Sequence, residues 1–156
     1  MRALLQRVTR AQVGIDGEVV GRIGPGLVVL LGVGQEDDDS IAEALAAKVV
    51  ALRIFADEQG LTNRSLAEAG GAVLVVSQFT LYADTRKGRR PSFIRAGNPV
   101  LGERLYERFC DELAALGAHV EHGRFGADMD VELVNEGPFT IWLDSDELEL
   151  RARPAR

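Results

Sequence analysis

The 156-residue sequence has few of the side chains from which most hydrolase and metal sites are built. It holds one cysteine, Cys110, and two histidines, His119 and His122, and it has no HExxH, CxxC, GxSxG or GxxxxGKS/T motif. Zinc sites, nucleophile elbows and P-loops need those patterns, so the sequence favours none of them. We expect Cys110 to be a packing residue of a helix and the histidines to form a surface pair. No metal ion and no cofactor is predicted.

Long apolar runs and a basic overall charge are also missing. The apolar run 27–31 is far too short to cross a bilayer, and the first residues alternate like a strand instead of resembling a signal peptide. With a single cysteine, this pattern predicts a reducing, cytoplasmic setting and no membrane partner. The formal net charge of −6 argues against indiscriminate nucleic-acid binding.

What is present predicts one mixed α/β domain over residues 1–145, followed by a charged tail over residues 146–156. Helical spacing of apolar residues predicts two main helices, at 40–52 and 101–116, and residues 63–69 look like a short turn or helix. An Asp16-Gly17 turn favours a hairpin between the first two strands. The other predicted strands are the alternating or continuous apolar runs at 27–33, 72–76, 119–121, 129–134 and 139–143.

Four residues follow the buried strand 72–76 where it should reach the surface, namely Ser77, Gln78, Phe79 and Thr80. Ligand sites favour such strand ends. Thr80 is the tempting nucleophile, but an unassisted hydroxyl is weak and no neighbouring base is evident, so it can equally cap or orient the strand end. If the protein is an enzyme, we expect it to work through backbone donors, positioning and a group on the substrate.

A basic stretch interrupts the acidic chain. Residues 86–95 carry +5 and no acid, which leaves −11 for the rest of a chain whose total is −6. A solvated loop is one interpretation of such a run. Its place after residues 77–80 favours contact with phosphate groups. The cations are Arg86, Lys87, Arg89, Arg90 and Arg95.

The hexad Asn135-Glu136-Gly137-Pro138-Phe139-Thr140 separates two runs that both alternate like strands. Proline cannot donate to a sheet ladder, so the pair Gly137-Pro138 predicts a sharp break between two strands. An ordinary hairpin turn is one interpretation. The other is a turn that aims bare carbonyl oxygens at a ligand, since glycine lacks the Cβ that would keep another molecule away.

These two motifs, 77–81 and 135–140, resemble in sequence and order the signature segments of the D-aminoacyl-tRNA deacylases. The likeness extends through Leu4-Leu5-Gln6-Arg7-Val8, Tyr82-Ala83-Asp84, Arg90-Pro91-Ser92-Phe93 and Gly123-Arg124-Phe125-Gly126-Ala127-Asp128-Met129. The resemblance implies a three-layer α/β/β domain with mostly antiparallel sheets that forms a homodimer with its active sites at the subunit interface.

The same resemblance implies roles for the motif residues. Gly137 and Pro138, joined by a cis bond, would form a chiral filter that each subunit lends to its partner, supported by Arg7, Asn135 and Thr140. The catalytic pocket would be lined by Ser77, Gln78, Phe79 and Thr80. Independently of the resemblance, the charge of the basic stretch and its place in the chain predict tRNA contacts at Arg86, Lys87, Arg89 and Arg90. One departure is Phe139, since valine commonly follows the proline in that family.

The implied activity is hydrolysis of the ester in D-aminoacyl-tRNA, and in glycyl-tRNA, with a ribose hydroxyl of the RNA assisting catalysis and L-aminoacyl-tRNA rejected. Two alternatives stay open. A related deacylase that acts on an L-aminoacyl-tRNA carries the same Gly-Pro pair as a trans bond, and a non-enzymatic module that binds the tRNA end would equally lack catalytic side chains.

Overall fold

The structure, a computed structural model of the chain, describes residues 1–148 and 150. One six-stranded sheet has the order β2-β1-β3-β6-β7, and β8 pairs with the other edge of β1. β1 is antiparallel to β2, β3 and β8, whereas β3, β6 and β7 run parallel. The predicted mixed α/β single domain is confirmed. The strands of this sheet are β1 (Arg2–Ile15), β2 (Glu18–Ile23), β3 (Gly26–Gly32), β6 (Ala72–Ser77), β7 (His119–His122) and β8 (Asp130–Asp144).

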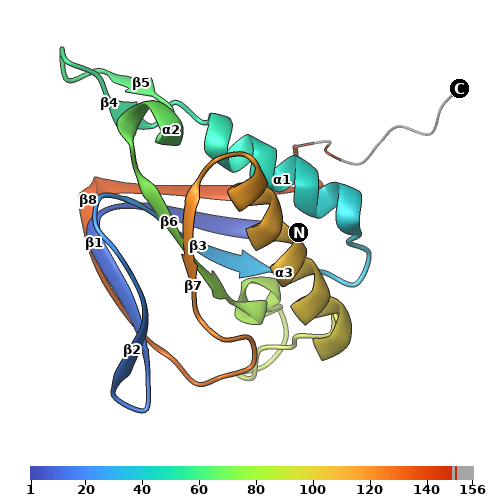
Figure 1. Cartoon of the computed structure of the whole chain (residues 1–156). Coiled ribbons are helices and arrows are strands. Elements are labelled where there is room, and N and C mark those ends of the chain that lie inside the picture. The colour runs from blue at the N-terminus through green and yellow to red at the C-terminus, as the bar shows by residue number, and fades with distance from the viewer. Residues whose placement is uncertain (149, 151–156) are drawn as a thin grey trace, which may run out of the picture.

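Two long helices cover one face of the sheet, as Figure 1 shows. Helix α1 (Asp39–Ala51) begins after Asp38, whose carboxylate accepts a hydrogen bond from the Ile41 N–H at 3.0 Å. Helix α3 (Pro99–Ala115) begins in the same way after Asn98, with proline at its first position. The remaining elements are the small pair β4 (Phe55–Ala56) and β5 (Thr62–Arg64), the short helix α2 (Leu66–Ala69) and the 3-10 turn η1 (Phe79–Tyr82).

The first hairpin forms where the sequence predicts it. Asp16 and Gly17 join β1 to β2 with φ angles of +51° and +82°. A two-residue hairpin turn whose central residues both have positive φ matches the twist of the flanking strands, and aspartate and glycine tolerate that region best.

Two apolar clusters lie on the two faces of the sheet. The larger fills the space between the sheet and the helices, with Leu105 and Phe109 of α3 fully buried. The smaller joins Val8, Ala11 and Val13 of β1 to Ile23, Val28, Leu74 and Val76. Because the second half of β1 pairs with β2, and β2 packs across β6 and β7, this part of the sheet folds over the face away from the helices.

The predicted break between two strands at Gly137-Pro138 is wrong. Residues 130–144 form one strand, and both of its halves pair with β1: Asn135 lies opposite Val8, and Thr140 lies opposite Gln6. Residues 136–139 therefore face a single residue, Arg7, and are pushed out of the ladder as a bulge. A hairpin turn would have reversed the chain. The prediction failed because the partner strand offers hydrogen bonds on both sides of the proline.

The isolated polar residues behave as expected. Cys110 is buried against the larger cluster, and burial raises the pKa of its thiol to about 12, so it stays protonated at neutral pH. His119 is exposed and lies 3.3 Å from Glu121. At the start of the predicted tail, the Leu148 and Leu150 N–H groups donate to the carbonyls of Asp144 and Ser145; the tail beyond residue 150 lies outside the described residues.

The described residues contain no helix that is both long and apolar enough to cross a membrane.

The larger cluster gives a test of the fold. Phe109→Ala removes a fully buried ring and is expected to lower the free energy of unfolding by about 3–5 kcal/mol. Val100→Ala, in the same helix but 80% exposed, should change it by less than about 0.5 kcal/mol. Urea unfolding at one fixed protein concentration measures both. Equal midpoints for the two variants would contradict the described core.

Candidate functional site

A cavity of about 610 Å³ opens where β6 ends. Ser77, Gln78 and Phe79 form one wall, whereas Thr80, which the sequence also predicts for this pocket, is not among the lining residues. The other walls come from segments far apart in the chain, and their main side chains are Phe93, Phe125, Met129 and Val131. The sequence reasoning missed these four as site residues, although Phe93, Phe125 and Met129 lie in segments that carry the family likeness.

The backbone around Gln78 is fixed by its neighbours in the sheet. Its N–H donates to the Leu31 carbonyl at 2.7 Å, and its own carbonyl accepts from the Leu81 N–H at 3.2 Å. The nearby Gly32 permits this approach, because a Cβ there would lie 3.0 Å from the Gln78 carbonyl oxygen. The Gln78 amide also donates to the Thr80 hydroxyl, which holds the two polar side chains together outside the strand.

Two main-chain donors remain unpaired beside the cavity. No acceptor in the described part of the chain takes a hydrogen bond from the N–H groups of Phe79 or Thr80, which open η1. The first N–H groups of a helical turn point outward and attract negative charge. Among the described lining residues, Asp128 is the one that can ionise, so the cavity offers donors but no histidine, cysteine or lysine.

The Phe79 ring is the exposed part of this wall. It is 57% exposed, and its edge meets the ring of Phe93 with centroids 5.0 Å apart and planes at 73°. Such edge-to-face pairs are worth about 0.5–1.5 kcal/mol beyond their burial. This contact joins η1 to the segment around Phe93, which follows the loop after η1.

The Gly137-Pro138 bulge forms a second, separate group. The peptide bond between the two residues is cis, and Gly137 has φ +123°. A Cβ at Gly137 would lie 3.1 Å from the Phe139 nitrogen, so an L side chain would be strained there by both its φ angle and its neighbours. Glu136, Gly137 and Pro138 are all exposed.

Arg7 lies behind this bulge and contacts it through several groups. Its Nη1 donates to the Ile54 carbonyl at 2.7 Å, its Nε lies 3.3 Å from the Glu136 carboxylate, and its guanidinium stands 4.5 Å from the centroid of the Phe139 ring. The aromatic ring of Phe139 thus provides a face for the cation.

Asn135 closes the bulge from inside. Its side-chain amide donates to the carbonyls of Arg7 at 2.9 Å and Phe139 at 3.0 Å, and its amide oxygen accepts from the Thr140 hydroxyl at 3.3 Å. The three residues predicted to support the Gly-Pro pair therefore all lie around it.

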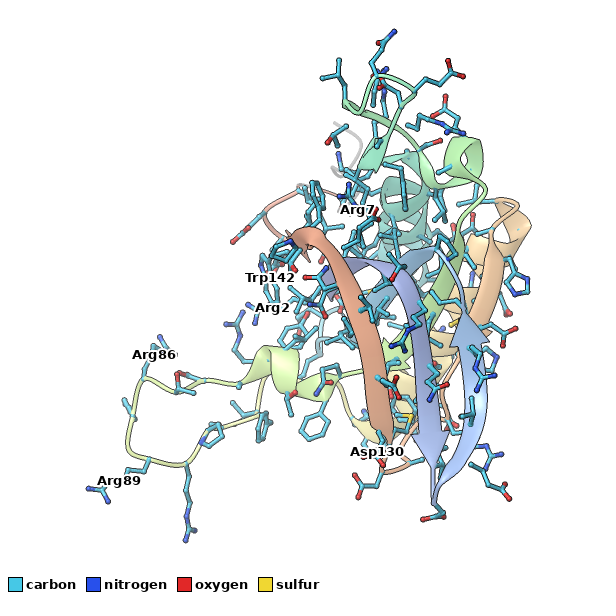
Figure 2. The ribbon with its side chains drawn as sticks, turned by 90° about the vertical axis from the view of Figure 1, so that its left-hand side faces the viewer. Arg2, Arg7, Arg86, Arg89, Asp130 and Trp142 are labelled. Carbon is cyan, nitrogen blue, oxygen red and sulfur yellow. The ribbon has the colours of Figure 1, made fainter. Side chains whose placement is uncertain are left out.

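The bulge and the cavity are far apart within one chain. Val131, on the cavity wall, and Gly137 are six residues apart on β8, which is roughly 20 Å at 3.3 Å per residue. Figure 2 shows the first part of β8 running from Asp130 to a corner near Arg7. A single chain brings Ser77, Gln78 and Phe79 together at the cavity and gathers the predicted filter residues around the bulge, but it does not join the two groups.

The predicted tRNA-contacting cations lie on a loop. Figure 2 shows Arg86 and Arg89 on the part of this loop that extends away from the body of the protein. Arg86 forms an ion pair with Asp84 at 2.6 Å. No group of three or more histidine, cysteine or acidic side chains that could hold a metal ion occurs among the residues described.

Sequence comparison places most of the chain in a known group. A family model described as D-Tyr-tRNA(Tyr) deacylase matches residues 4–144. A D-aminoacyl-tRNA deacylase from Symbiobacterium thermophilum is 62% identical over 147 residues, which cover 94% of this chain and 97% of that protein. A D-aminoacyl-tRNA deacylase from Ruegeria pomeroyi is 60% identical over 144 residues, which cover 92% of this chain and 99% of that protein.

Solved structures agree with this placement. One described as c-Myc DNA Unwinding Element Binding Protein has a TM-score of 0.88 at 39% identity and covers 93% of this chain and 99% of that one. Another, described as a probable eukaryotic D-amino acid tRNA deacylase, has a TM-score of 0.79 at 21% identity and covers 91% of this chain and 97% of that one. At this identity the match shows a likeness of fold alone. Since the family model spans nearly all of the described domain and curated relatives share three fifths of its residues, the chain belongs to the D-Tyr-tRNA(Tyr) deacylase family.

Proposed function

We propose that this protein is an aminoacyl-tRNA editing hydrolase of the cytoplasm that cleaves the ester of D-aminoacyl-tRNA into a free D-amino acid and tRNA. The observation that carries the proposal is the cavity beside Ser77, Gln78 and Phe79, with unpaired N–H groups at its edge and no acid-base side chain except Asp128. Its volume of about 610 Å³ suits an aminoacylated nucleoside. The family and the names of its relatives support the choice of substrate.

The reaction suits a site of this kind because the substrate is already activated. The N–H groups of Phe79 and Thr80 bind the ester carbonyl oxygen and stabilise the negative charge that develops on it. The vicinal hydroxyl of the terminal ribose assists the attack, and the net reaction adds water across the ester bond. The protein contributes position, main-chain donors and exclusion of wrong substrates, so no cofactor is needed.

The second part of the proposal is a homodimer in which each subunit lends its Gly137-Pro138 bulge to the cavity of its partner. The bulge is exposed and lies far from the cavity of its own chain, so within one subunit it has nothing to select. Large apolar side chains on the same surface strand, among them Val131, Val134 and Trp142, are also more than a third exposed, which suits a face that a second copy covers.

Selection in this arrangement is steric. Rigid main-chain carbonyls of the bulge stand beside the α-carbon of the bound residue, where they collide with an L side chain and leave room for the α-hydrogen of a D residue. Arg7, Asn135 and Thr140 make the bulge rigid through the contacts described above. Glycine has no side chain to reject, so it passes the filter.

The substrate range tests the proposed reaction. Purified protein is expected to deacylate D-tyrosyl-tRNA and glycyl-tRNA and to leave L-tyrosyl-tRNA intact, because only the L side chain meets the bulge. Release of labelled amino acid measures all three, with spontaneous hydrolysis as the control. Preference for L-tyrosyl-tRNA would indicate the related L-specific deacylase, and binding without turnover would indicate a tRNA-end-binding protein.

Replacement of Thr80 tests whether the protein supplies the nucleophile. Thr80→Ala should keep D-tyrosyl-tRNA deacylation within about tenfold of wild type, because its hydroxyl only meets the Gln78 amide and the N–H group stays in place. Thr62→Ala, on the remote strand β5, is the matched control. Loss of more than about 1,000-fold in kcat, with tRNA binding and folding intact, would identify Thr80 as a nucleophile.

Mixing two inactive variants tests the shared site. Gly137→Ala distorts the bulge and Gln78→Ala damages the cavity wall, so each homodimer should be impaired in both sites. After the subunits are exchanged, about one quarter of wild-type activity should return, since half of the dimers are mixed and each mixed dimer has one intact site. If bulge and cavity of the same chain worked together, mixing would restore nothing.

A further inference from the structure

The loop after η1 is organised as an arm with a fixed base. Residues 84–92, here called the basic arm, are closed by two backbone hydrogen bonds between Asp84 and Ser92, at 2.8 and 2.9 Å. Beyond the base, residues 86–90 are all exposed, and Gly88 turns the chain with φ +70°. The arm carries four cations and one acid, a net charge of +3 in a chain of −6.

The four cations of the arm are not equivalent. The Asp84 carboxylate accepts hydrogen bonds from the Arg86 N–H at 3.1 Å and from its guanidinium at 2.8 and 2.6 Å. These bonds hold the pKa of Asp84 well below its usual range, so the acid stays charged at neutral pH. No acid in the described part of the chain pairs with Lys87, Arg89 or Arg90.

The arm is connected to the cavity at both ends. Its first residue follows η1, where the Ala83 N–H donates to the Thr80 carbonyl at 3.0 Å. Its last residue precedes Phe93, whose ring meets that of Phe79 on the cavity wall. A ligand whose end occupies the cavity and whose chain leaves it on this side must pass along the arm. About 3.3 Å per residue over four residues gives the arm a reach of roughly 13 Å.

We infer that the basic arm binds the phosphate backbone next to the nucleotide held in the cavity, with Lys87, Arg89 and Arg90 as the contacting cations and Arg86 as a positioning residue. This inference rests on the proposed function for its choice of partner, a tRNA. The sequence predicts four cations that contact tRNA, and this inference keeps three of them as phosphate contacts. Contacts with phosphate carry no base sequence, so the arm strengthens binding of different tRNAs equally.

The salt dependence of binding counts the contacts. Filter binding of labelled, deacylated tRNA between about 50 and 200 mM salt gives the slope of log Kd against log salt concentration. Each of Lys87→Ala, Arg89→Ala and Arg90→Ala should lower that slope by about 0.7–0.9, and the triple variant by about 2–3. A matched triple variant of the exposed cations Arg22, Lys48 and Arg104, on β2, α1 and α3, should keep the wild-type slope.

A second comparison separates Arg86 from the other three. Arg86→Gln leaves the Asp84 carboxylate without its partner and lowers the net charge of the arm, so the salt dependence of tRNA binding should fall in this variant. The double variant Asp84→Asn with Arg86→Gln restores the net charge of +3, and the wild-type slope should return. If Arg86 were itself a phosphate contact, the double variant would keep the reduced slope, and the role of Arg86 as a positioning residue would be overturned.

The outcomes distinguish the arm from the reaction. An unchanged slope for the Lys87, Arg89 and Arg90 triple variant, in a protein whose wild type deacylates D-tyrosyl-tRNA, would overturn the arm and leave the proposed function intact. A slope that depends on the arm in a protein without deacylase activity would support the arm and reject the function. A change from dimer to monomer in the triple variant, seen by sedimentation, would make the arm a contact between copies and overturn the inference.

Discussion

The pairing of β1 with both halves of β8 is the constraint on which the rest of this structure depends. β8 follows β1 from Asp130 opposite Gly14 to Asp144 opposite Arg2, and four residues of β8 stand where β1 has one. Buried backbone groups must be paired, so the ladder is kept on both sides and the surplus residues are extruded. Proline has no N–H to lose in such a bulge, and Gly137 accepts the positive φ that the bulge requires.

The residue opposite the extrusion also stabilises it. The Arg7 carbonyl accepts a hydrogen bond from the Asn135 amide, and the Arg7 guanidinium contacts the Phe139 ring and the Glu136 carboxylate. The residue of β1 that lies opposite the bulge therefore also holds the bulge in place. At its other end, β8 contributes Val131 to the cavity wall. A single strand in a paired sheet therefore sets the distance between bulge and cavity, and this distance is too long for the two to meet within one chain.

Features that depend on neighbours in sequence were predictable, and features that depend on distant pairing were not. The Asp16-Gly17 hairpin, the helix after Asp38 and the polar residues after β6 follow from local turn chemistry, capping and periodicity. The continuity of β8 does not, because it is decided by the edge of β1, more than a hundred residues earlier. The cavity wall also escaped prediction, since Phe93 and Phe125 reach it from separate segments whose meeting no local pattern encodes.

Under the proposed function, the charge distribution gives an acidic protein a way to orient an RNA. With a total of −6, most of the surface repels phosphate, and within the Debye length of about 8 Å at physiological salt only nearby charges matter. The basic arm concentrates +3 beside the cavity, so attraction is confined to one approach. A uniformly basic protein would bind tRNA in many orientations, most of which leave the ester outside the cavity. In the proposed complex, repulsion elsewhere on the surface would add to specificity, because it would disfavour unproductive orientations of the tRNA that compete with the productive one.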